Sequence, residues 1–209
     1  MAESTVEHIH DEPATLPVST SDVLHAGRVF DLVTEDVDLG DGGTVTREFL
    51  KHPGAVAIVA LDEQERVLLI RQYRHPVRAY LWEVPAGLLD VPGEPLLGAA
   101  QRELAEEADL TAASWHTLAD YYTSPGGSDE GLRVFLARDL DEIPEDDRYQ
   151  RGEEELGMPT MWVPLEEAVR LVQTGALHNP SAVVGVLAAH AARAGDWTGL
   201  RPADAAWVR

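Results

Sequence analysis

Two neighbouring apolar runs constrain the fold of this chain more than any other feature of its sequence. AVAIVAL occupies residues 55–61 and VLLIRQY occupies residues 67–73, with only the charged turn 62–66 between them. Both runs are rich in β-branched and aliphatic residues, which favours buried strands. The short separation predicts that the two runs pair with each other as a buried hairpin at the start of the main body.

The elements expected after this hairpin mix strands with helices. LWEVPAG at 81–87 is typical of a third strand, and a helix is expected to begin at Glu94-Pro95, because proline is tolerated in the first turn. Its apolar stripe, at spacings of three and four, consists of Leu97, Ala100, Leu104 and Ala108. The remaining expected elements are strands at 114–122, 132–140 and 161–165 and helices at 166–175 and 179–194. This order predicts an α/β sandwich with a mixed sheet.

The first 53 residues have a different character from the main body. Residues 1–22 are polar, contain proline and lack periodicity, which predicts a mobile polar tail. In residues 23–53, two strand-like stretches flank Asp41-Gly42-Gly43, which is typical of a hairpin turn. We therefore expect a small, separate antiparallel sheet at 23–53. The main domain is expected at 54–197 and a C-terminal tail at 198–209.

Charge and residue usage exclude several classes of function. The chain has 37 acidic and 16 basic residues and a formal net charge of -21, so it repels nucleic acid and acidic membranes unless cations intervene. No run approaches the roughly 20 apolar residues of a membrane span, and the N-terminus lacks the pattern of a signal peptide. Cysteine is absent, which excludes disulfides and thiolate chemistry and fits a reducing cytoplasm, where we expect the protein.

Three glutamates gather on one face of the helix that is expected to begin near Glu94. At about 100° per residue, Glu103, Glu106 and Glu107 fall within an arc of roughly 100° that borders the apolar stripe. Like charges at these spacings destabilise a helix unless cations bind them, and carboxylates are the ligands that hard divalent cations prefer. The pattern therefore indicates a metal site. The alternative is an ordinary solvated helix face.

Residues on either side of these glutamates fit the same interpretation. Gly87 ends the strand that precedes the helix, and the backbone carbonyl of Ala86 is the nearest additional oxygen ligand. Arg102 lies two turns after Glu94, so an ion pair between them is expected to brace the loop against the helix. The alternative for Glu94 is a favourable interaction with the helix dipole alone.

Together these residues resemble the Nudix box, the signature of hydrolases that cleave nucleoside diphosphates linked to another moiety. The matching positions are Gly87, Glu94, Arg102-Glu103-Leu104, Glu106-Glu107 and Leu110. The sequence departs from the usual box at two places. Six residues rather than five separate Gly87 from Glu94, and Asp109 stands where the box has glycine. A left-handed C-cap favours glycine at that place, although aspartate tolerates the conformation better than most residues.

The resemblance implies a Nudix-type α/β/α sandwich and a metal-dependent hydrolase. The implied cofactor is Mg²⁺, with Mn²⁺ as a possible substitute, at two or three ions per site. The implied metal ligands are Glu103, Glu106, Glu107 and the carbonyl of Ala86. The residues implied to shape the box are Gly87, Glu94 and Arg102.

A catalytic glutamate outside the box is also implied by the resemblance. In related enzymes it lies on a loop before the strand that corresponds here to residues 161–165. The candidates are Glu153, Glu154 and Glu155. Spacing back from Trp162 favours Glu155 first and Glu154 second, although a run of charge is often only solvated.

The substrate is indicated by the loop TSPGGSDE at 123–130. Pro125 lies sixteen residues after Asp109, which resembles the marker of the ADP-ribose pyrophosphatase branch; the alternative is a plain turn. The resemblance, which extends from about Gly27 to His190, implies hydrolysis of ADP-ribose to AMP and ribose 5-phosphate. The implied substrate-binding residues are Arg47 and Arg74 for the pyrophosphate or terminal ribose, Glu83 for the adenine edge, and Glu130. The alternatives are surface ion pairs for the arginines and an outward-facing side chain for Glu83.

Other functions remain as competing hypotheses. One is a Nudix pyrophosphatase for another nucleoside diphosphate derivative, such as NADH, a dinucleoside polyphosphate or a nucleotide sugar. A second is a non-catalytic module that senses ADP-ribose, which the intact Arg-Glu-Leu-x-Glu-Glu core disfavours. Related pyrophosphatases exchange an N-terminal sheet between subunits, so the resemblance also implies a homodimer with N-terminal strand exchange.

Overall fold

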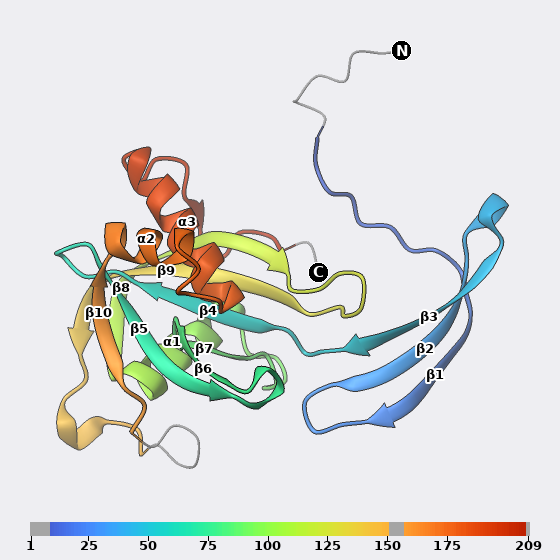
Figure 1. The fold of residues 1–209 in the computed structure, drawn as a ribbon, viewed down its shortest axis with the longest axis horizontal. Helices are drawn as coiled ribbons and strands as arrows, with labels where there is room; N and C mark the ends of the chain where they lie inside the picture. The colour runs from blue at the N-terminus through green and yellow to red at the C-terminus, as the bar shows by residue number, and fades with distance from the viewer. Residues whose placement is uncertain (1–8, 151–156, 208–209) are drawn as a thin grey trace.

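The computed structural model describes residues 9–150 and 157–207, which form a main body and a small sheet that projects from it (Figure 1). The projecting sheet is antiparallel, with strand order β1-β2-β3. Its strands are β1 (Val18–Ala26), β2 (Asp31–Asp38) and β3 (Thr44–Lys51). The turn between β2 and β3 contains Gly40–Gly42 in a 3₁₀ conformation, so the predicted hairpin is present.

The main body contains two further sheets. The larger sheet has the strand order β11-β8-β9-β4-β7. It is mixed, because β4 pairs with β9 in parallel and every other pair is antiparallel. The smaller is antiparallel, with the order β10-β5-β6. The larger sheet consists of β4 (Ala55–Ala60), β7 (Ala86–Leu88), β8 (Leu110–Tyr122), β9 (Gly131–Glu142) and β11 (Arg201–Pro202). The smaller sheet consists of β5 (Arg66–Arg74), β6 (Ala79–Glu83) and β10 (Thr160–Pro164).

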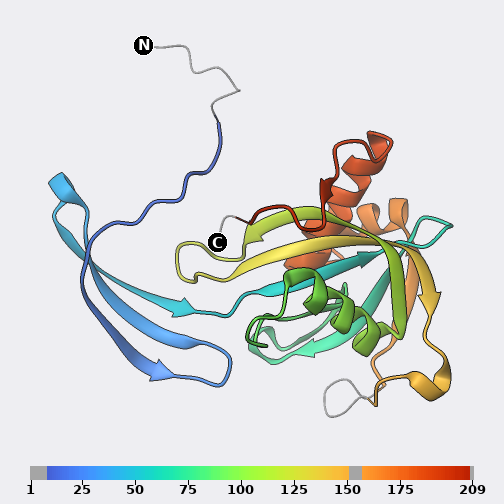
Figure 2. The ribbon, with the colours of Figure 1, turned by 180° about the vertical axis from the view of Figure 1, so that it is seen from behind.

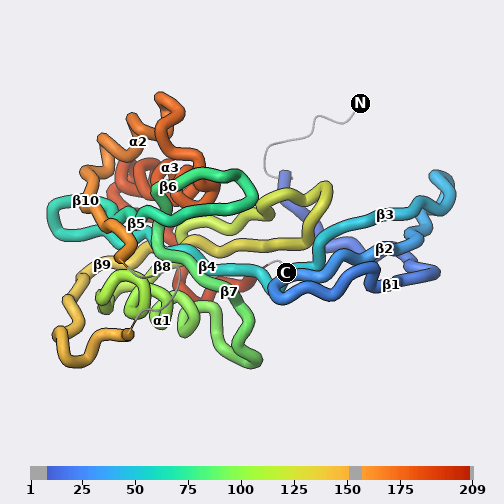
Figure 3. Tube along the Cα trace, turned by 60° about the horizontal axis from the view of Figure 1, so that its bottom comes forward, coloured from blue at the N-terminus to red at the C-terminus, as the bar shows by residue number. Residues whose placement is uncertain are grey.

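Helices cover both faces of the larger sheet. The three α-helices of the described ranges are α1 (Leu96–Ala108), α2 (Leu165–Gln173) and α3 (Pro180–Ala194). Figure 3 shows α1 on one side of the strands and α2 and α3 on the other, and the view from behind in Figure 2 shows α1 lying across the sheet. Two apolar clusters fill the layers, one under α1 and one under α2 and α3. The predicted α/β sandwich with a mixed sheet is therefore present. None of the helices in the described ranges is long and apolar enough to cross a membrane.

The two apolar runs that begin the main body do not form the predicted hairpin. β4 lies in the larger sheet between β9 and β7, whereas β5 lies in the smaller sheet between β10 and β6. A single antiparallel bridge, Leu61 to Val67, joins the ends of the two strands. β4 is buried along its whole length because α1 covers one of its faces and α3 covers the other. Burial on both faces fits a central strand as well as a hairpin, so the apolar pattern did not identify the partner.

Three other segments differ from the prediction. The strand expected at 81–87 is broken at Val84-Pro85, and its two parts, β6 and β7, belong to different sheets. The N-terminal module has three strands instead of two, because β1 begins at Val18, within the segment 1–22 expected to be a tail. At the other end, residues 201–202 form β11 within the predicted C-terminal tail. β7 and β11 pair with strands that are distant in sequence, β4 and β8, whereas β1 pairs with the neighbouring strand β2.

Candidate active site

The candidate site is built at the junction of β7 and α1. β7 is an edge strand of the larger sheet, and α1 packs across β4, β7 and β8. α1 ends at Asp109, whose φ of 56° and ψ of 36° place it in the left-handed region, and its N–H donates to the carbonyls of Leu104 and Ala105. The predicted left-handed C-cap is therefore present, with aspartate in place of glycine.

Glu103 lies against Gly87. The residue is buried, at 9% exposure, although its side chain is a carboxylate. A Cβ added at Gly87 would overlap the carboxyl carbon of Glu103, so any other residue at 87 would displace that carboxylate. The requirement for glycine therefore comes from a close approach between strand and helix.

Glu107 is connected to the strand by a hydrogen bond. Its Oε2 accepts the N–H of Ala86 at 2.9 Å, and its side chain is 7% exposed. The N–H of Ile58 donates to the carbonyl of Pro85, and Ala57 is opposite Ala86 in the β4–β7 ladder. Because a residue's N–H and C=O point to the same side of a strand, both polar groups of Ala86 face away from β4. The Ala86 carbonyl thus points toward the side on which Glu107 lies.

Arg102 connects the box residues to one another. Its Nε and Nη2 donate to the two oxygens of Glu94 at 3.1 and 3.0 Å. Its Nη1 donates to Glu103 Oε1 at 2.5 Å and to Glu106 Oε2 at 3.4 Å. The predicted brace between Glu94 and Arg102 is present as a bidentate pair. The hydrogen bonds to Glu94, opposed by desolvation and reinforced by Glu103, raise the pKa of Arg102, and the same bonds lower the pKa of Glu94.

The box residues have the chemistry of a site for hard cations. Within residues 9–150 and 157–207, no three acidic or histidine side chains converge as a ready-formed metal site. Glu103 is held by Arg102, and Glu107 is held by the backbone of Ala86. Even so, three carboxylates share one face of α1, and the Ala86 carbonyl of the neighbouring strand β7 points toward the same side. The lack of a Cβ at Gly87 lets this helix face approach the strand. Such an all-oxygen donor set suits Mg²⁺ or a similar ion.

Arg74 and Glu83, both predicted to bind substrate, bind each other. Arg74 Nε donates to Glu83 Oε1 at 2.9 Å, and Nη2 donates to Oε2 at 2.6 Å, across the β5–β6 pair. Glu83 is 1% exposed, so the alternative of an outward-facing side chain is wrong. Arg74 is partly exposed at 43% of its side chain. The pair therefore leaves the arginine as the accessible member.

Glu130 ends a loop that contacts the N-terminal module. Its Oε2 accepts the hydroxyl of Thr123 at 2.6 Å, and its Oε1 lies 3.7 Å from His52 Nδ1. Its backbone N–H donates to the hydroxyl of Ser128 at 3.1 Å. The structure therefore places Glu130 at the base of the 123–130 loop, next to the residue that follows β3.

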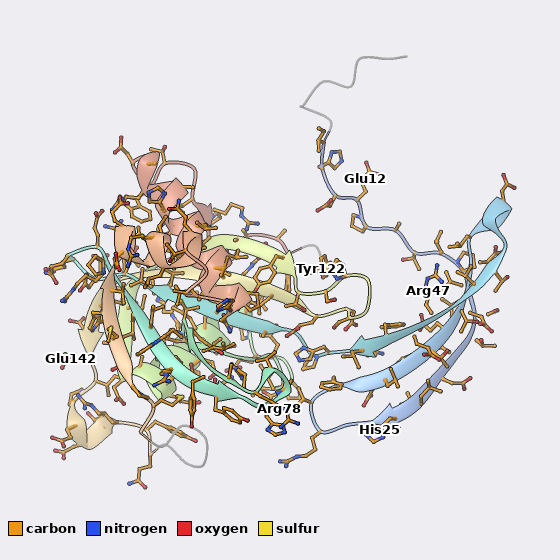
Figure 4. All side chains as sticks on the ribbon, viewed as in Figure 1. Glu12, His25, Arg47, Arg78, Tyr122 and Glu142 are labelled. Carbon is orange, nitrogen blue, oxygen red and sulfur yellow. The ribbon has the colours of Figure 1, made fainter. Side chains whose placement is uncertain are left out.

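Arg47 lies on the N-terminal sheet, opposite the loop rather than beside α1. Figure 4 shows it on β3, across from Tyr122 on the main body. The two residues line a groove of about 420 Å³ together with Phe49 from β3 and the loop residues Pro125 and Ser128. Within a single chain, therefore, Arg47 does not lie with the box residues.

Comparison with known proteins identifies the family. The NUDIX domain matches residues 51–183. The chain belongs to the Nudix hydrolase family. The match includes all of the box residues and the 123–130 loop, so the family predicted from the spacing of the glutamates is confirmed.

Relatives of this Nudix protein are similar over most of their length. The chain is 46% identical over 189 residues to a protein named ADP-ribose pyrophosphatase from Mycobacterium tuberculosis (strain ATCC 25618 / H37Rv), covering 90% of this chain and 89% of the relative. It is 38% identical to an ADP-ribose pyrophosphatase from Bacillus subtilis (strain 168), covering 75% and 82%. Among solved structures, "Crystal structure of ADP compounds hydrolase" superposes with a TM-score of 0.72 at 22% identity, over 90% of this chain and 98% of that one. This likeness confirms the predicted fold.

Two sets of residues remain to be placed in the Nudix site: the predicted catalytic glutamates and one residue, His52, that was not predicted. Glu153, Glu154 and Glu155 lie outside the described residues. His52 was not predicted to belong to the site, yet its ring lies near Glu130 and accepts the N–H of Gly54 at 3.0 Å. Its position in TREFLKHPG, directly after a strand and before the apolar run, was the available signal.

Proposed function

We propose that this protein hydrolyses the pyrophosphate bond of ADP-ribose to give AMP and ribose 5-phosphate. The observation that carries the proposal is the junction of β7 and α1, where Gly87 admits the carboxylate of Glu103 and where the whole box is present. The similarity over 90% of the chain to an ADP-ribose pyrophosphatase supports this choice of substrate. A sensing module without activity is disfavoured, because all three carboxylates of the box remain on α1.

Nudix hydrolases generally need a divalent metal. We propose Mg²⁺, with Mn²⁺ as a substitute, at two or three ions per site. The residues that would hold the ions are Glu103, Glu106, Glu107 and the carbonyl of Ala86. Bound ions of this kind neutralise a diphosphate and make a water molecule more acidic. A protein with a net charge of -21 thereby accepts an anionic substrate.

The remaining roles belong to side chains of this chain. Arg74, whose side chain is 43% exposed, would bind phosphate oxygens, since the guanidinium fork matches their geometry. Glu83 would act by orienting Arg74, because its carboxylate is buried and both of its oxygens accept from that guanidinium, so it is not retained as the residue that contacts adenine. Glu130 would contact the substrate from the base of the 123–130 loop. Glu155, or else Glu154, would accept the proton of the attacking water.

The N-terminal sheet supports a homodimer in which each site uses both chains. It projects away from the main body in Figures 1 and 2. It exposes apolar side chains, with Val23 at 58% and Leu24 at 52% on β1 and Phe30 at 45% in the connection to β2. Exposed apolar groups on a projecting sheet are typical of an interface with another chain. In such an exchange, Arg47, or Arg28 just before β2, would act on the site of the partner subunit.

The proposed function is tested by a hydrolysis screen with product identification. ADP-ribose, NADH, a dinucleoside polyphosphate and a nucleotide sugar are each incubated with the protein and Mg²⁺, and the products are separated by chromatography. We expect the highest kcat/KM for ADP-ribose, with AMP and ribose 5-phosphate as products. A higher kcat/KM for any of the other compounds would assign the protein to that substrate. The cytoplasmic location proposed from the absence of cysteine is tested by fractionation of the source cells.

A further inference from the structure

A buried arginine outside the Nudix box, separated from Gly87 by the central strand β4, has no role in the function proposed above. Arg133 on β9 is 1% exposed. Its Nε and Nη2 donate to the two oxygens of Asp120 on β8 at 2.7 and 3.0 Å. The same guanidinium donates to two backbone carbonyls near the C-terminus, from Nη1 to Ala205 at 2.7 Å and from Nη2 to Ala206 at 3.2 Å. A buried guanidinium is costly unless its N–H groups are satisfied, so Arg133 depends on the C-terminal segment.

Other contacts hold the C-terminal segment, residues 201–207, against β8. β11 pairs with β8, and the hydroxyl of Thr117 donates to the carbonyl of Pro202 at 3.0 Å. Arg201 Nη1 donates to Asp120 Oδ2 at 2.9 Å. The ring of Trp207 lies over the guanidinium of Arg133, 5.8 Å from ring centroid to carbon. The segment is therefore attached at both of its ends, and the attachment converges on the pair of Arg133 and Asp120.

This pair lies where the 123–130 loop leaves the sheet. Asp120 is directly opposite Arg133 in the β8–β9 ladder, and the ladder ends two pairs later at Tyr122 and Gly131. Figure 1 shows the C-terminal segment running back along β8 toward this loop. The C-terminal segment and the loop thus share one anchoring point.

The loop in turn binds the segment that connects the N-terminal sheet to the main body. The N–H of Leu50 donates to the carbonyl of Gly127 at 3.0 Å, and the N–H of Asp129 donates to the carbonyl of Leu50 at 3.1 Å. The N–H of His52 donates to Asp129 Oδ1 at 2.7 Å. The 123–130 loop therefore holds the N-terminal sheet to the main body through hydrogen bonds.

We propose that Arg133 and the C-terminal segment 201–207 position the 123–130 loop, and through it the N-terminal sheet, relative to the Nudix domain. Arg133 acts as a positioning residue, because its guanidinium joins the base of the loop to the carbonyls of Ala205 and Ala206. Loss of those carbonyls leaves N–H groups of a buried cation without acceptors, which loosens the end of the β8–β9 ladder. The loop contacts of Leu50 and His52 then open more often. The consequence for substrate affinity rests on the proposed role of Glu130.

The positioning role is tested by hydrogen exchange in two truncated chains. Removal of residues 205–209 deletes both carbonyl acceptors and Trp207 but keeps β11, and removal of 208–209 alone is the matched control. We expect the amides of Leu50 and His52 to exchange about tenfold faster in the first variant and at the wild-type rate in the second. The amide of Ile58, bonded to Pro85 inside the domain, and that of Leu39, bonded to Gly43 at the tip of the N-terminal sheet, serve as references. Equal acceleration of all four amides, or no change at Leu50 and His52, would overturn the proposal.

A milder substitution gives the same answer if the truncated chain does not fold. Arg201→Ala removes one hydrogen bond to Asp120 and leaves Arg133 with all of its acceptors. It should accelerate exchange at Leu50 and His52 by a smaller factor than the truncation does, and it should leave the two reference amides at the wild-type rate. Arg170→Ala, which removes an exposed ion pair with Glu167 on α2, should leave these amides unchanged. An identical pattern in the two variants would contradict a specific role of the C-terminal segment.

Substrate kinetics separate this inference from the proposed function. With ADP-ribose, removal of 205–209 should raise KM about tenfold and change kcat less than twofold, because the loop affects binding rather than the box. An unchanged KM would overturn the link to substrate affinity. If the full chain does not cleave ADP-ribose at all, the proposed function fails, and the exchange pattern still decides whether the C-terminal segment positions the loop.

Discussion

Two arginine–carboxylate clusters of this protein differ in burial and in the sequence distance of their partners. Arg102 lies on α1, is 29% exposed in its side chain, and has its partners within eight residues. Arg133 lies on β9, is 1% exposed, and has partners 13, 72 and 73 residues away. The first cluster is partly exposed and joins three carboxylates of the box, those of Glu94, Glu103 and Glu106. The second joins distant segments of the chain and is closed to solvent.

The comparison shows that similar ion pairs serve different purposes according to burial. A partly exposed arginine beside several carboxylates can exchange contacts at modest cost, because water and ions replace them. A buried arginine cannot, because each lost acceptor leaves an N–H group unsatisfied in a medium of low dielectric constant. We therefore expect substitutions at the first cluster to have the larger effect on activity and substitutions at the second to have the larger effect on stability.

The largest stability effect is expected from removing the buried guanidinium. Arg133→Met should lower the free energy of unfolding by about 3–5 kcal/mol, because Asp120 and two backbone carbonyls lose their donor. Urea denaturation followed by circular dichroism measures this. The control is Arg170→Met on the exposed face of α2, where a loss within about 1 kcal/mol is expected. Equal losses in the two variants would remove the distinction between the clusters.

The largest activity effect outside the carboxylates themselves is expected at Gly87. Gly87→Ala places a Cβ on the carboxyl carbon of Glu103 and should lower kcat/KM by about 100-fold, or roughly 2.7 kcal/mol. The matched control is Gly98→Ala on α1, where the added Cβ makes only ordinary contacts, 3.6 Å from Pro95 Cδ. Gly98→Ala should keep the activity and stabilise the helix by up to about 1 kcal/mol. Wild-type activity in Gly87→Ala would show that the position of Glu103 is unimportant.

A smaller effect is expected from changing the geometry of the brace. Arg102→Lys keeps the charge but loses the bidentate contact with Glu94, so stability should fall by about 1 kcal/mol. kcat/KM should fall more than in Arg170→Lys, since Arg102 also holds Glu103. Thermal unfolding and initial rates measure the two quantities. A larger loss of stability than in Arg133→Met would reverse the comparison.

The smallest effect is a pH dependence at the buried cluster. Burial raises the pKa of Asp120, but hydrogen bonds from Arg133 and Arg201 outweigh it, and the pKa lies below the ordinary value of 3.8. A lowered pKa in the folded state contributes stability above the unfolded pKa, and this is lost as the pH falls through the folded pKa. The stability difference between wild type and Asp120→Asn should therefore be constant at neutral pH and shrink below pH 3.8. A difference that grows on acidification would contradict this sign.

The first cluster could be predicted from the sequence because all of its residues lie close together along the chain. Helical spacing alone places Glu103, Glu106 and Glu107 on one face, and eight residues separate Glu94 from Arg102. The left-handed cap at Asp109 followed from the same motif. The fold class also followed from the order of strands and helices, and superposition on a solved structure confirms it.

The second cluster and the strand partners could not be predicted, because they depend on distant pairing. Nothing in the sequence near Arg133 indicates that its acceptors are the carbonyls of Ala205 and Ala206, because every residue of the chain carries a backbone carbonyl. The pattern of β4 and β5 indicated burial but not which strand each one pairs with. β1 is exposed along its whole length, so it had no apolar alternation to reveal it.

The carboxylates of α1 are proposed to hold the divalent ions needed to cleave ADP-ribose. The direct test is the rate of AMP release by wild type and Glu107→Gln, with Mg²⁺ and with excess chelator. Glutamine keeps an oxygen that can accept the N–H of Ala86, so the variant should unfold at the wild-type temperature. We predict AMP release only with Mg²⁺ and at least about a 100-fold slower rate in Glu107→Gln. A wild-type rate in the folded variant, or full turnover in chelator, would contradict the account.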